Sequence, residues 1–172
     1  MQINRSVPLS ETTAQAVPIL IDTNPESARD FDLFEHVAPE TKPQSTTKVL
    51  LVDDSELTLA RAKSVLSARF AVVGMATNGQ AALEAAATLK PDVVVLDISM
   101  PGMTGFEVAA RLRAAGSTAQ LVFLTVHEEK ELILAARNAG AIGYVVKTRM
   151  ASDLELAVRE ARAGRPFQSP PS

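Results

Sequence analysis

The sequence predicts an α/β domain with a doubly wound parallel sheet, and two features of the chain support this prediction. First, five short aliphatic runs alternate with five longer segments in which small and aliphatic residues recur at helical spacing. Strands that alternate with helices form a parallel sheet with helices on both faces. Second, the runs are almost continuously aliphatic, as in "DVVVL" at residues 92–96, which is typical of strands buried on both faces.

The regular pattern begins at residue 48 and contains five expected strands. They are "KVLLV", "FAVVGM", "DVVVL", "QLVFLT" and "AIGYVV", at residues 48–52, 70–75, 92–96, 120–125 and 141–146. Each run has the length of an ordinary strand. We expect every crossover between successive strands to be right-handed.

Five expected helices follow the strands, and four of them have a clear apolar stripe. These stripes are Leu59, Ala62 and Leu66; Ala82, Ala85, Ala86 and Leu89; Gly105, Val108, Ala109 and Leu112; and Leu154, Ala157, Val158 and Ala161. The remaining helix, within residues 128–140, has acids in its first turn and Gly140 placed to cap its end. Asp153 is expected near the N-terminus of the last helix.

The composition limits the class of protein. With 172 residues, the chain is long enough for one domain with its own core and some additional sequence. Hydrophobic residues make up 47% and aromatic residues only 4%, so we expect an aliphatic core. The net charge of −3 argues against a general attraction to nucleic acid. The lack of cysteine excludes disulfides, thiolate metal sites and cysteine nucleophiles.

Three segments are expected along the chain. Residues 1–46 contain five prolines and no sustained period, which predicts a mostly disordered N-terminal extension. Residues 47–165 are the expected folded domain, and residues 166–172 are an expected C-terminal tail. No apolar run approaches the ~20 residues of a membrane span, and the N-terminus lacks a signal-peptide pattern. Together with the absence of cysteine, this leads us to expect a cytoplasmic protein.

Polar residues stand where four of the expected strands end. Asp53 and Asp54 follow the first strand, Asp97 follows the third, Thr125 ends the fourth and Lys147 follows the fifth. In open parallel sheets, ligands bind outside the carboxyl ends of the strands. These five side chains are therefore expected to meet at one rim.

The chemistry of this expected rim follows from its residue types. Three neighbouring carboxylates repel one another unless a cation lies between them. Oxygen ligands without cysteine or a nearby histidine favour a hard ion, and we expect Mg²⁺. A metal and Lys147 together would attract an anion such as a phosphoryl group. A carboxylate can itself be the nucleophile that accepts this group, forming an aspartyl phosphate.

With these residues in place, the segment 47–165 resembles a response regulator receiver domain of two-component signalling. The resemblance depends on "LLVDD", "VVVLDISMPGMTGFE", "FLT" and "GYVVK", which occur in this order across the domain. It implies a flavodoxin-like (βα)5 fold with the strand order 2-1-3-4-5. The segment "GYVVKTRMASDLELAVREARAGRPFQSP" is most similar to receivers that precede a LuxR-type helix-turn-helix domain.

The resemblance implies a role for each residue at the rim. Asp97 corresponds to the phosphoacceptor, which receives its phosphoryl group from a histidine kinase or a phosphotransfer protein. Asp54 corresponds to a direct metal ligand, and Asp53 to a partner that acts mainly through water. Ser99 stands where a backbone carbonyl completes the metal site.

The resemblance also implies the parts of a switch. Thr125 corresponds to the hydroxyl that bonds a phosphoryl oxygen, and Lys147 to the ammonium that pairs with the phosphate. Tyr144 corresponds to an aromatic residue that moves inward as the threonine moves. The expected output is a partner or a phosphorylation-dependent homodimer, with no contact to nucleic acid through this chain.

Two features of the site region differ from common receivers or vary among them. Many receivers have a proline after the lysine, where this chain has Thr148, so the shape of the loop is not set by a cis proline. Ser99 and His127 flank the expected phosphorylation site, at positions that vary in the family and affect the lifetime of the phosphoryl group.

Three alternatives stand beside a stand-alone phosphorylation switch. A haloacid-dehalogenase-like phosphatase also uses an aspartate nucleophile after a strand, but it needs an acid two residues later, where this chain has Ser99. A pseudo-receiver that acts only as an interaction module would not need Asp97, Thr125 and Lys147. The third alternative is the receiver half of a truncated DNA-binding transcriptional regulator. We expect a signalling protein that is not an enzyme.

Overall fold

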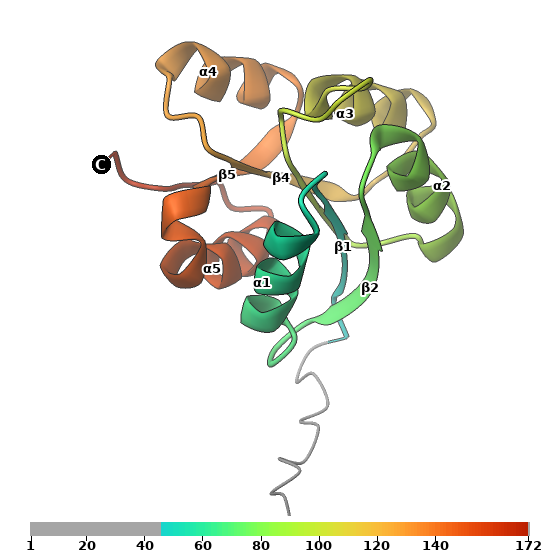
Figure 1. Cartoon of the computed structure of the whole chain (residues 1–172), viewed down its shortest axis with the longest axis horizontal. Helices are drawn as coiled ribbons and strands as arrows, with labels where there is room; N and C mark the ends of the chain where they lie inside the picture. Colours follow the sequence, from blue (N-terminus) through green and yellow to red (C-terminus); the bar gives the residue numbers. More distant parts are fainter. Residues whose placement is uncertain (1–45, 172) are drawn as a thin grey trace, which may run out of the picture. The chain divides into compact units, whose positions relative to one another are not determined.

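The computed structural model describes residues 46–171, which are coloured in Figure 1. The extension expected over residues 1–46 lies outside the described residues, apart from residue 46. The strands are β1 (Lys48–Val52), β2 (Ala71–Ala76), β3 (Val93–Leu96), β4 (Gln120–Thr125), β5 (Ala141–Val146) and β6 (Phe167–Gln168). The helices are α1 (Glu56–Leu66), α2 (Gly79–Leu89), α3 (Gly105–Ala114), α4 (Lys130–Asn138) and α5 (Met150–Arg162), with a 3-10 turn η2 (Lys147–Arg149) before α5.

The sheet is parallel throughout and has the order β2-β1-β3-β4-β5-β6. This confirms the predicted α/β class, and it confirms the order 2-1-3-4-5 that the family resemblance implied. β1 and β3 are neighbours although β2 lies between them in the sequence. The order therefore reverses at β1, so the carboxyl ends of β1 and β3 border the crevice where such sheets bind ligands.

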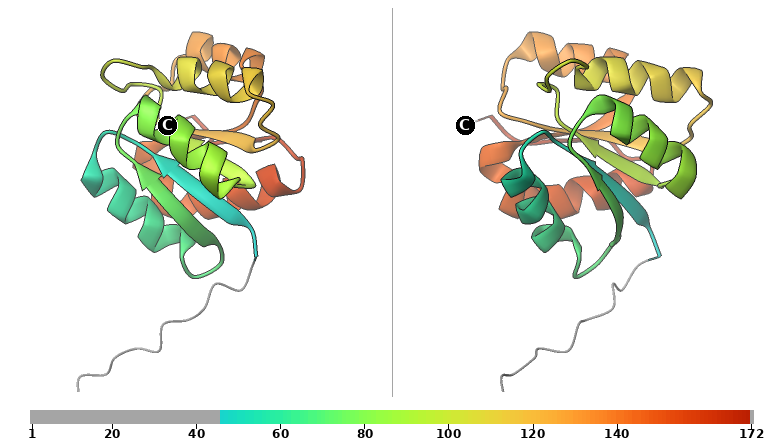
Figure 2. Two further views of the ribbon diagram at one scale, coloured as in Figure 1. Left: turned by 90° about the vertical axis from the view of Figure 1, so that its right-hand side faces the viewer. Right: turned by 45° about the vertical axis from the view of Figure 1, so that its right-hand side comes forward.

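Helices cover both faces of the sheet and enclose two aliphatic cores. Figures 1 and 2 show α1 and α5 on one face, and α2, α3 and α4 on the other. Alternate strand residues point to opposite faces: Leu50 packs under α2 and α3, whereas Val49 and Leu51 pack under α1 and α5. Two aromatic rings, Phe106 and Phe123, join the first core with their centroids 5.1 Å apart.

Side chains at the helix starts explain where α1, α2 and α3 begin. Ser55 caps α1, and Asn78 caps α2 by accepting a hydrogen bond from a backbone N–H of the first turn. Thr104 and Glu107 form a reciprocal capping box at the start of α3. Just after the C-terminal end of α4, Gly140 has a φ of +81°, which confirms its predicted role in ending that helix.

The sheet extends beyond residue 165, where the sequence analysis ends the domain. Phe167 and Gln168 form β6, which pairs in parallel with Gly143 and Tyr144 of β5. Ser169, expected in a tail, is 3% exposed. The sequence analysis missed this strand because a run of two residues has no period that a pattern can reveal.

No helix within residues 46–171 combines the length and the apolar character that a membrane span requires.

We predict that Gly105 is required for the close packing of α3 on the end of β3. A Cβ at this position would lie 2.1 Å from the backbone oxygen of Asp97, and backbone cannot move aside as a flexible side chain can. Gly105→Ala should therefore lower the free energy of unfolding by about 3 kcal/mol, the upper end of the usual cost of overpacking, in urea titrations. The control is Gly116→Ala, where a Cβ meets open space and the left-handed backbone costs only about 1 kcal/mol. Equal losses in the two variants would contradict the packing argument.

Candidate functional site

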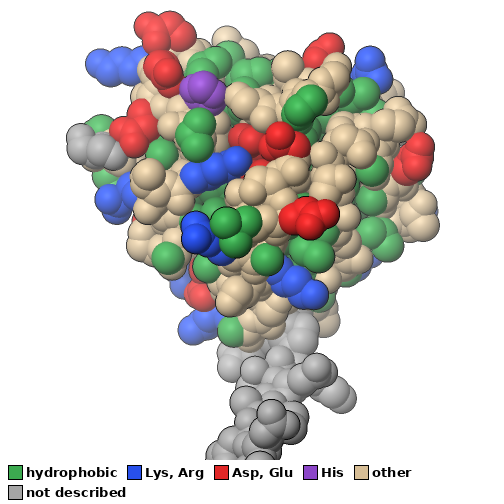
Figure 3. All heavy atoms as spheres, in the orientation of Figure 1, with side chains coloured by type: hydrophobic (Ala, Val, Ile, Leu, Met, Phe, Trp, Pro, Cys, Tyr) green, Lys and Arg blue, Asp and Glu red, His purple; other side chains and the backbone are tan. Residues whose placement is uncertain are grey.

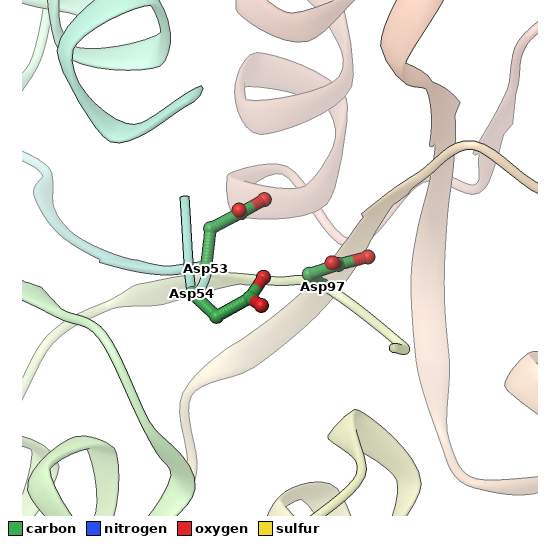
Figure 4. Close-up of side chains that lie close together, drawn as sticks. All are labelled: Asp53, Asp54 and Asp97. Atoms are coloured by element: carbon green, nitrogen blue, oxygen red, sulfur yellow. The ribbon is translucent and has the colours of Figure 1, made fainter. Parts of the chain in front are cut away.

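The carboxyl ends of β1 and β3 bring together the acids that the sequence analysis placed at one rim. Asp53 N donates a hydrogen bond to Ala76 O at 3.1 Å, and Asp97 N donates to Val52 O at 2.9 Å. These bonds continue the sheet beyond β1 and β3 and hold Asp97 beside the end of β1. Figure 4 shows the side chains of Asp53, Asp54 and Asp97 close together.

The three carboxylates form a cluster that fits a cation. One oxygen of each lies within 4.8 Å of the others, with Asp53 and Asp97 buried and Asp54 exposed. Within the described part of the chain, Asp97 Oδ1 is buried and has no hydrogen-bond partner of good geometry, and the Ser99 N–H interacts only weakly with the Asp97 carboxylate. Buried polar atoms normally have a partner, and a carboxylate oxygen is a ligand that Mg²⁺ prefers. The cluster therefore has the donor set and an open ligand atom for a hard divalent ion.

Lys147 supplies the positive charge nearest to the two buried acids. Its Nζ lies 2.7 Å from Asp53 Oδ2 and 3.0 Å from Asp97 Oδ2. The contact with Asp97 has hydrogen-bond geometry, whereas the shorter contact with Asp53 is an ion pair with a less favourable angle. Burial lowers the pKa of Lys147, but the interactions with Asp53 and Asp97 outweigh burial and raise it above the ordinary value. Lys147 is therefore a cation at neutral pH.

The ionised form of Asp97 is disfavoured in this site. Burial raises the pKa of Asp97 above its ordinary value; the Lys147 ammonium opposes this rise, and the charge of Asp53 adds to it. The Asp53 carboxylate is fixed from the other side, because Oδ1 accepts a hydrogen bond from Ser55 N at 2.9 Å. Three carboxylates against one ammonium leave an excess of negative charge at the rim, which a further cation would balance.

A chain of polar contacts borders Asp97 on the β4 side. Thr125 is fully buried at the end of β4, and its Oγ1 accepts a hydrogen bond from His127 N at 3.3 Å. The exposed Ser99 Oγ lies 2.9 Å from His127 Nε2, and His127 Nδ1 lies 3.5 Å from a carboxylate oxygen of Glu129. The sequence analysis placed Ser99 and His127 on either side of the site but did not predict that they bond to each other. No spacing rule joins residues so far apart in the sequence.

Tyr144 connects the same segment to β5. The residue is 4% exposed, and its hydroxyl donates a hydrogen bond to His127 O at 3.1 Å. The ring is therefore already in an inward position in this structure, where the resemblance implied an inward movement. Burial raises the pKa of Tyr144 to about 12, and the negative charges of Glu129 and Asp97 act in the same direction.

The site reaches the surface of the domain. Figure 3 shows acidic side chains beside a basic side chain near the middle of the face in view, with a histidine close by. Asp53, Asp54, Asp97, Thr125 and Lys147 lie at or next to the carboxyl ends of β1, β3, β4 and β5, with Ser99 in the loop after β3 and Tyr144 inside β5. The fold therefore brings together residues that the sequence distributes over almost a hundred positions.

Comparison with known proteins identifies relatives of this domain. The response regulator receiver domain family matches residues 49–159. The nitrate/nitrite response regulator protein NarL of Escherichia coli strain K12 is 35% identical over 123 residues, which are 70% of this chain and 57% of NarL. A two-component response regulator of the LuxR family from Aurantimonas sp. SI85-9A1 has a similar crystal structure, with a TM-score of 0.70, 32% identity, and coverage of 73% of this chain and 91% of that chain. The signal receiver domain of the putative response regulator NarL from Mycobacterium tuberculosis has a TM-score of 0.64, 35% identity, and coverage of 70% and 99%.

The curated relatives are longer than the part that matches. The match spans 57% of E. coli NarL, and between about half and three fifths of the other leading relatives. The similarity therefore concerns the receiver portion of those proteins.

We predict that Tyr144 ionises about two pH units later in the folded protein than in the unfolded chain. The chain has one tyrosine and no tryptophan, so the absorbance of phenolate reports on Tyr144 alone. The transition should occur near pH 12 when the protein is folded and near the usual ~10 in concentrated urea. Between these values the folded state retains a proton that the unfolded state has lost, so stability falls as the pH rises through this interval. A midpoint near 10 in the folded protein would contradict the buried, hydrogen-bonded phenol.

Proposed function

This chain belongs to the response regulator receiver domain family of two-component signalling, and from this premise we propose that it is a switch operated by phosphorylation of Asp97. The observation that carries the proposal is the state of the Asp97 carboxylate. One of its oxygens is paired with Lys147, and the other is buried without a hydrogen bond among the described residues. A carboxylate arranged in this way has one oxygen available as a ligand or a nucleophile.

The proposed reaction is transfer of a phosphoryl group to Asp97. A carboxylate oxygen forms a bond to phosphorus as the bond between phosphorus and the donor breaks, and the electron pair of that bond leaves with the donor. When the donor is a phosphohistidine of a histidine kinase or a phosphotransfer protein, the leaving group is the imidazole nitrogen. Lys147 and the Thr125 hydroxyl are positioned to pair with the oxygens of the transferred group.

The residues of the rim fit a magnesium ion. Asp53, Asp54 and Asp97 would hold it, with the backbone carbonyl of Ser99 as a further ligand. When bound, Mg²⁺ neutralises negative charge on the phosphoryl oxygens and the acids. The fit is supported by the excess of carboxylates over ammonium groups and by the unsatisfied Asp97 oxygen.

The proposed switch uses Thr125 and Tyr144. Both contact His127 through its backbone, so a displacement of the Thr125 hydroxyl toward a phosphoryl oxygen would alter the segment that holds the Tyr144 ring. Because the ring is already inward, phosphorylation would stabilise this arrangement relative to others, and it need not create it. The surface formed by α4, β5 and α5 would then bind a protein partner or a second copy of the chain.

A second candidate function is the receiver part of a longer DNA-binding transcriptional regulator. The observation that favours it is that the curated relatives extend well beyond the matched segment. Sequencing the complete reading frame distinguishes this candidate from a stand-alone receiver. Both candidates require the same chemistry at Asp97, and in both we propose a signalling role without enzymatic turnover.

We predict that Mg²⁺ stabilises the folded protein through the acidic rim. A ligand that binds only the folded state raises stability by about 2.7 kcal/mol at a hundred times its Kd, so the melting temperature should rise with Mg²⁺ at constant ionic strength. Asp54→Ala should remove most of this rise. The matched control is Glu84→Ala, because Glu84 is an exposed acid on α2 and lies outside the cluster. A wild-type protein that does not respond to millimolar Mg²⁺ at neutral pH would rule out the metal site.

We predict that Asp97 is the only phosphoacceptor. With Mg²⁺ and acetyl phosphate, intact-mass spectrometry should show the addition of one phosphoryl group that is stable in acid and lost in base. Asp97→Asn should abolish the addition. Asp92→Asn should retain it, since Asp92 lies at the opposite end of β3 and its contact with Lys48 N can also be made by an asparagine oxygen. Continued modification of Asp97→Asn would move the acceptor elsewhere.

A further inference from the structure

The loop that carries Lys147 lacks a proline that would fix its shape, so other contacts must fix it. Lys147 begins the 3-10 turn η2 and is followed by Thr148. A lysine side chain is long and flexible, and its ammonium reaches two acids at once only if the backbone at its base is held in place. The described residues contain a polar network that ties the backbone before Lys147 and the Arg149 side chain after it to one carboxylate.

Asp153 is the centre of this network. It lies in the first turn of α5 and is 6% exposed. Its Oδ2 accepts hydrogen bonds from Arg149 Nε at 2.9 Å and from Ser169 Oγ at 2.7 Å, and its Oδ1 accepts one from Ser152 Oγ at 2.6 Å. Burial raises the pKa of Asp153, but these hydrogen bonds and the charge of Arg149 outweigh burial and hold it below the ordinary value. Asp153 is therefore an ionised acceptor that orients its three donors.

Ser169 joins this network to β5. Its side chain is buried, and its Oγ accepts a hydrogen bond from Val146 N at 3.3 Å while donating to Asp153. Its own N–H donates to Tyr144 O at 2.9 Å, which places the end of β6 against the last residues of β5. Val146 immediately precedes Lys147, so the backbone just before the lysine is tied through Ser169 to Asp153.

We propose that Ser169 and Asp153 form a latch that positions Lys147 at the acidic rim. The latch ties both flanks of Lys147 to one carboxylate: Val146 through Ser169, and Arg149 directly. Ser169 lies beyond residues 49–159, the part that matches the receiver family, and beyond the expected end of the domain at residue 165. The C-terminal segment therefore helps to position a residue of the site. This inference rests on the proposed function insofar as the role of Lys147 is to pair with the phosphoryl group.

The contacts of β6 provide both the variant and a matched control. Ser169→Ala removes the hydroxyl and leaves the Val146 N–H without its acceptor, whereas Ser169→Thr keeps a hydroxyl. The neighbouring Gln168 points away from the latch and accepts a hydrogen bond from Arg137 of α4 at 2.8 Å. Gln168→Ala therefore weakens the attachment of β6 without affecting the latch.

The experiment measures two properties of the full chain. One is the rate of phosphorylation by saturating acetyl phosphate with Mg²⁺, followed by intact mass. The other is the NMR resonance of the Lys147 ammonium, which reports on its ion pairs and requires no phosphorylation. Ser169→Ala should slow phosphorylation by at least about fivefold, because small misplacements of a reacting group cost up to about 100-fold, and should shift the Lys147 resonance. Ser169→Thr should restore both properties, and Gln168→Ala should stay within twofold of the wild type.

The two measurements separate failure of the latch from failure of the proposed function. A Ser169→Ala protein with the wild-type rate and an unchanged Lys147 resonance overturns the latch. A wild-type protein that accepts no phosphoryl group refutes the proposed function, and the Lys147 resonance then decides on the latch alone. Should Ser169→Ala not fold, amide exchange in the wild type decides: a Val146 N–H as protected as the centre of β5 supports the latch, and rapid exchange at Val146 overturns it.

Discussion

The ion pairs of Lys147 with Asp53 and Asp97 are the interaction on which the rest of the site depends. Two buried carboxylates side by side are costly, and breaking a buried pair leaves an uncompensated charge. The parallel sheet places an opposite charge beside these acids. All of its strands end at the same edge, so Lys147 after β5 lies close to Asp53 after β1 and Asp97 after β3. The compensation is incomplete, since three acids face one ammonium. This deficit of positive charge is the reason why we propose that the rim binds a metal ion.

The supporting framework must be rigid close to Asp97. Gly105 allows the start of α3 to approach the Asp97 backbone more closely than any side chain would permit. On the other side, Thr125 and Tyr144 both bond to the backbone of His127, so the site and the outer face of β5 share one peptide segment. A change at the rim is thereby connected to a surface through a few hydrogen bonds. Such a connection needs only to bias two arrangements of similar energy.

The sequence revealed most of the fold and the residues of the rim because both leave local signals. A strand buried on both faces is a run such as Val93–Leu96, and the acid after it is conspicuous since it ends that run. The contacts that were missed join residues distant in the sequence: Ser99 with His127, and Asp153 with Ser169. Asp153 was placed correctly near the start of the last helix, but no local pattern in the sequence indicates its contact with Ser169. β6 was missed because its two residues form a strand only through their pairing with β5, which lies more than twenty residues earlier in the sequence.

The contacts of Ser169 extend the domain beyond the end of α5. The match to the receiver family spans residues 49–159, and α5 ends at Arg162, yet Ser169 is buried and bonded to both β5 and α5. A chain cut after α5 would leave Asp153 with one donor fewer and the Val146 N–H exposed at the edge of the sheet. Val146 directly precedes Lys147, and Asp153 bonds Arg149 two residues after it, so both losses affect the chain around the ammonium that compensates the two buried acids. The residues after α5 thus belong to the domain because the charge balance at the carboxyl end of β5 depends on a backbone that they hold in place.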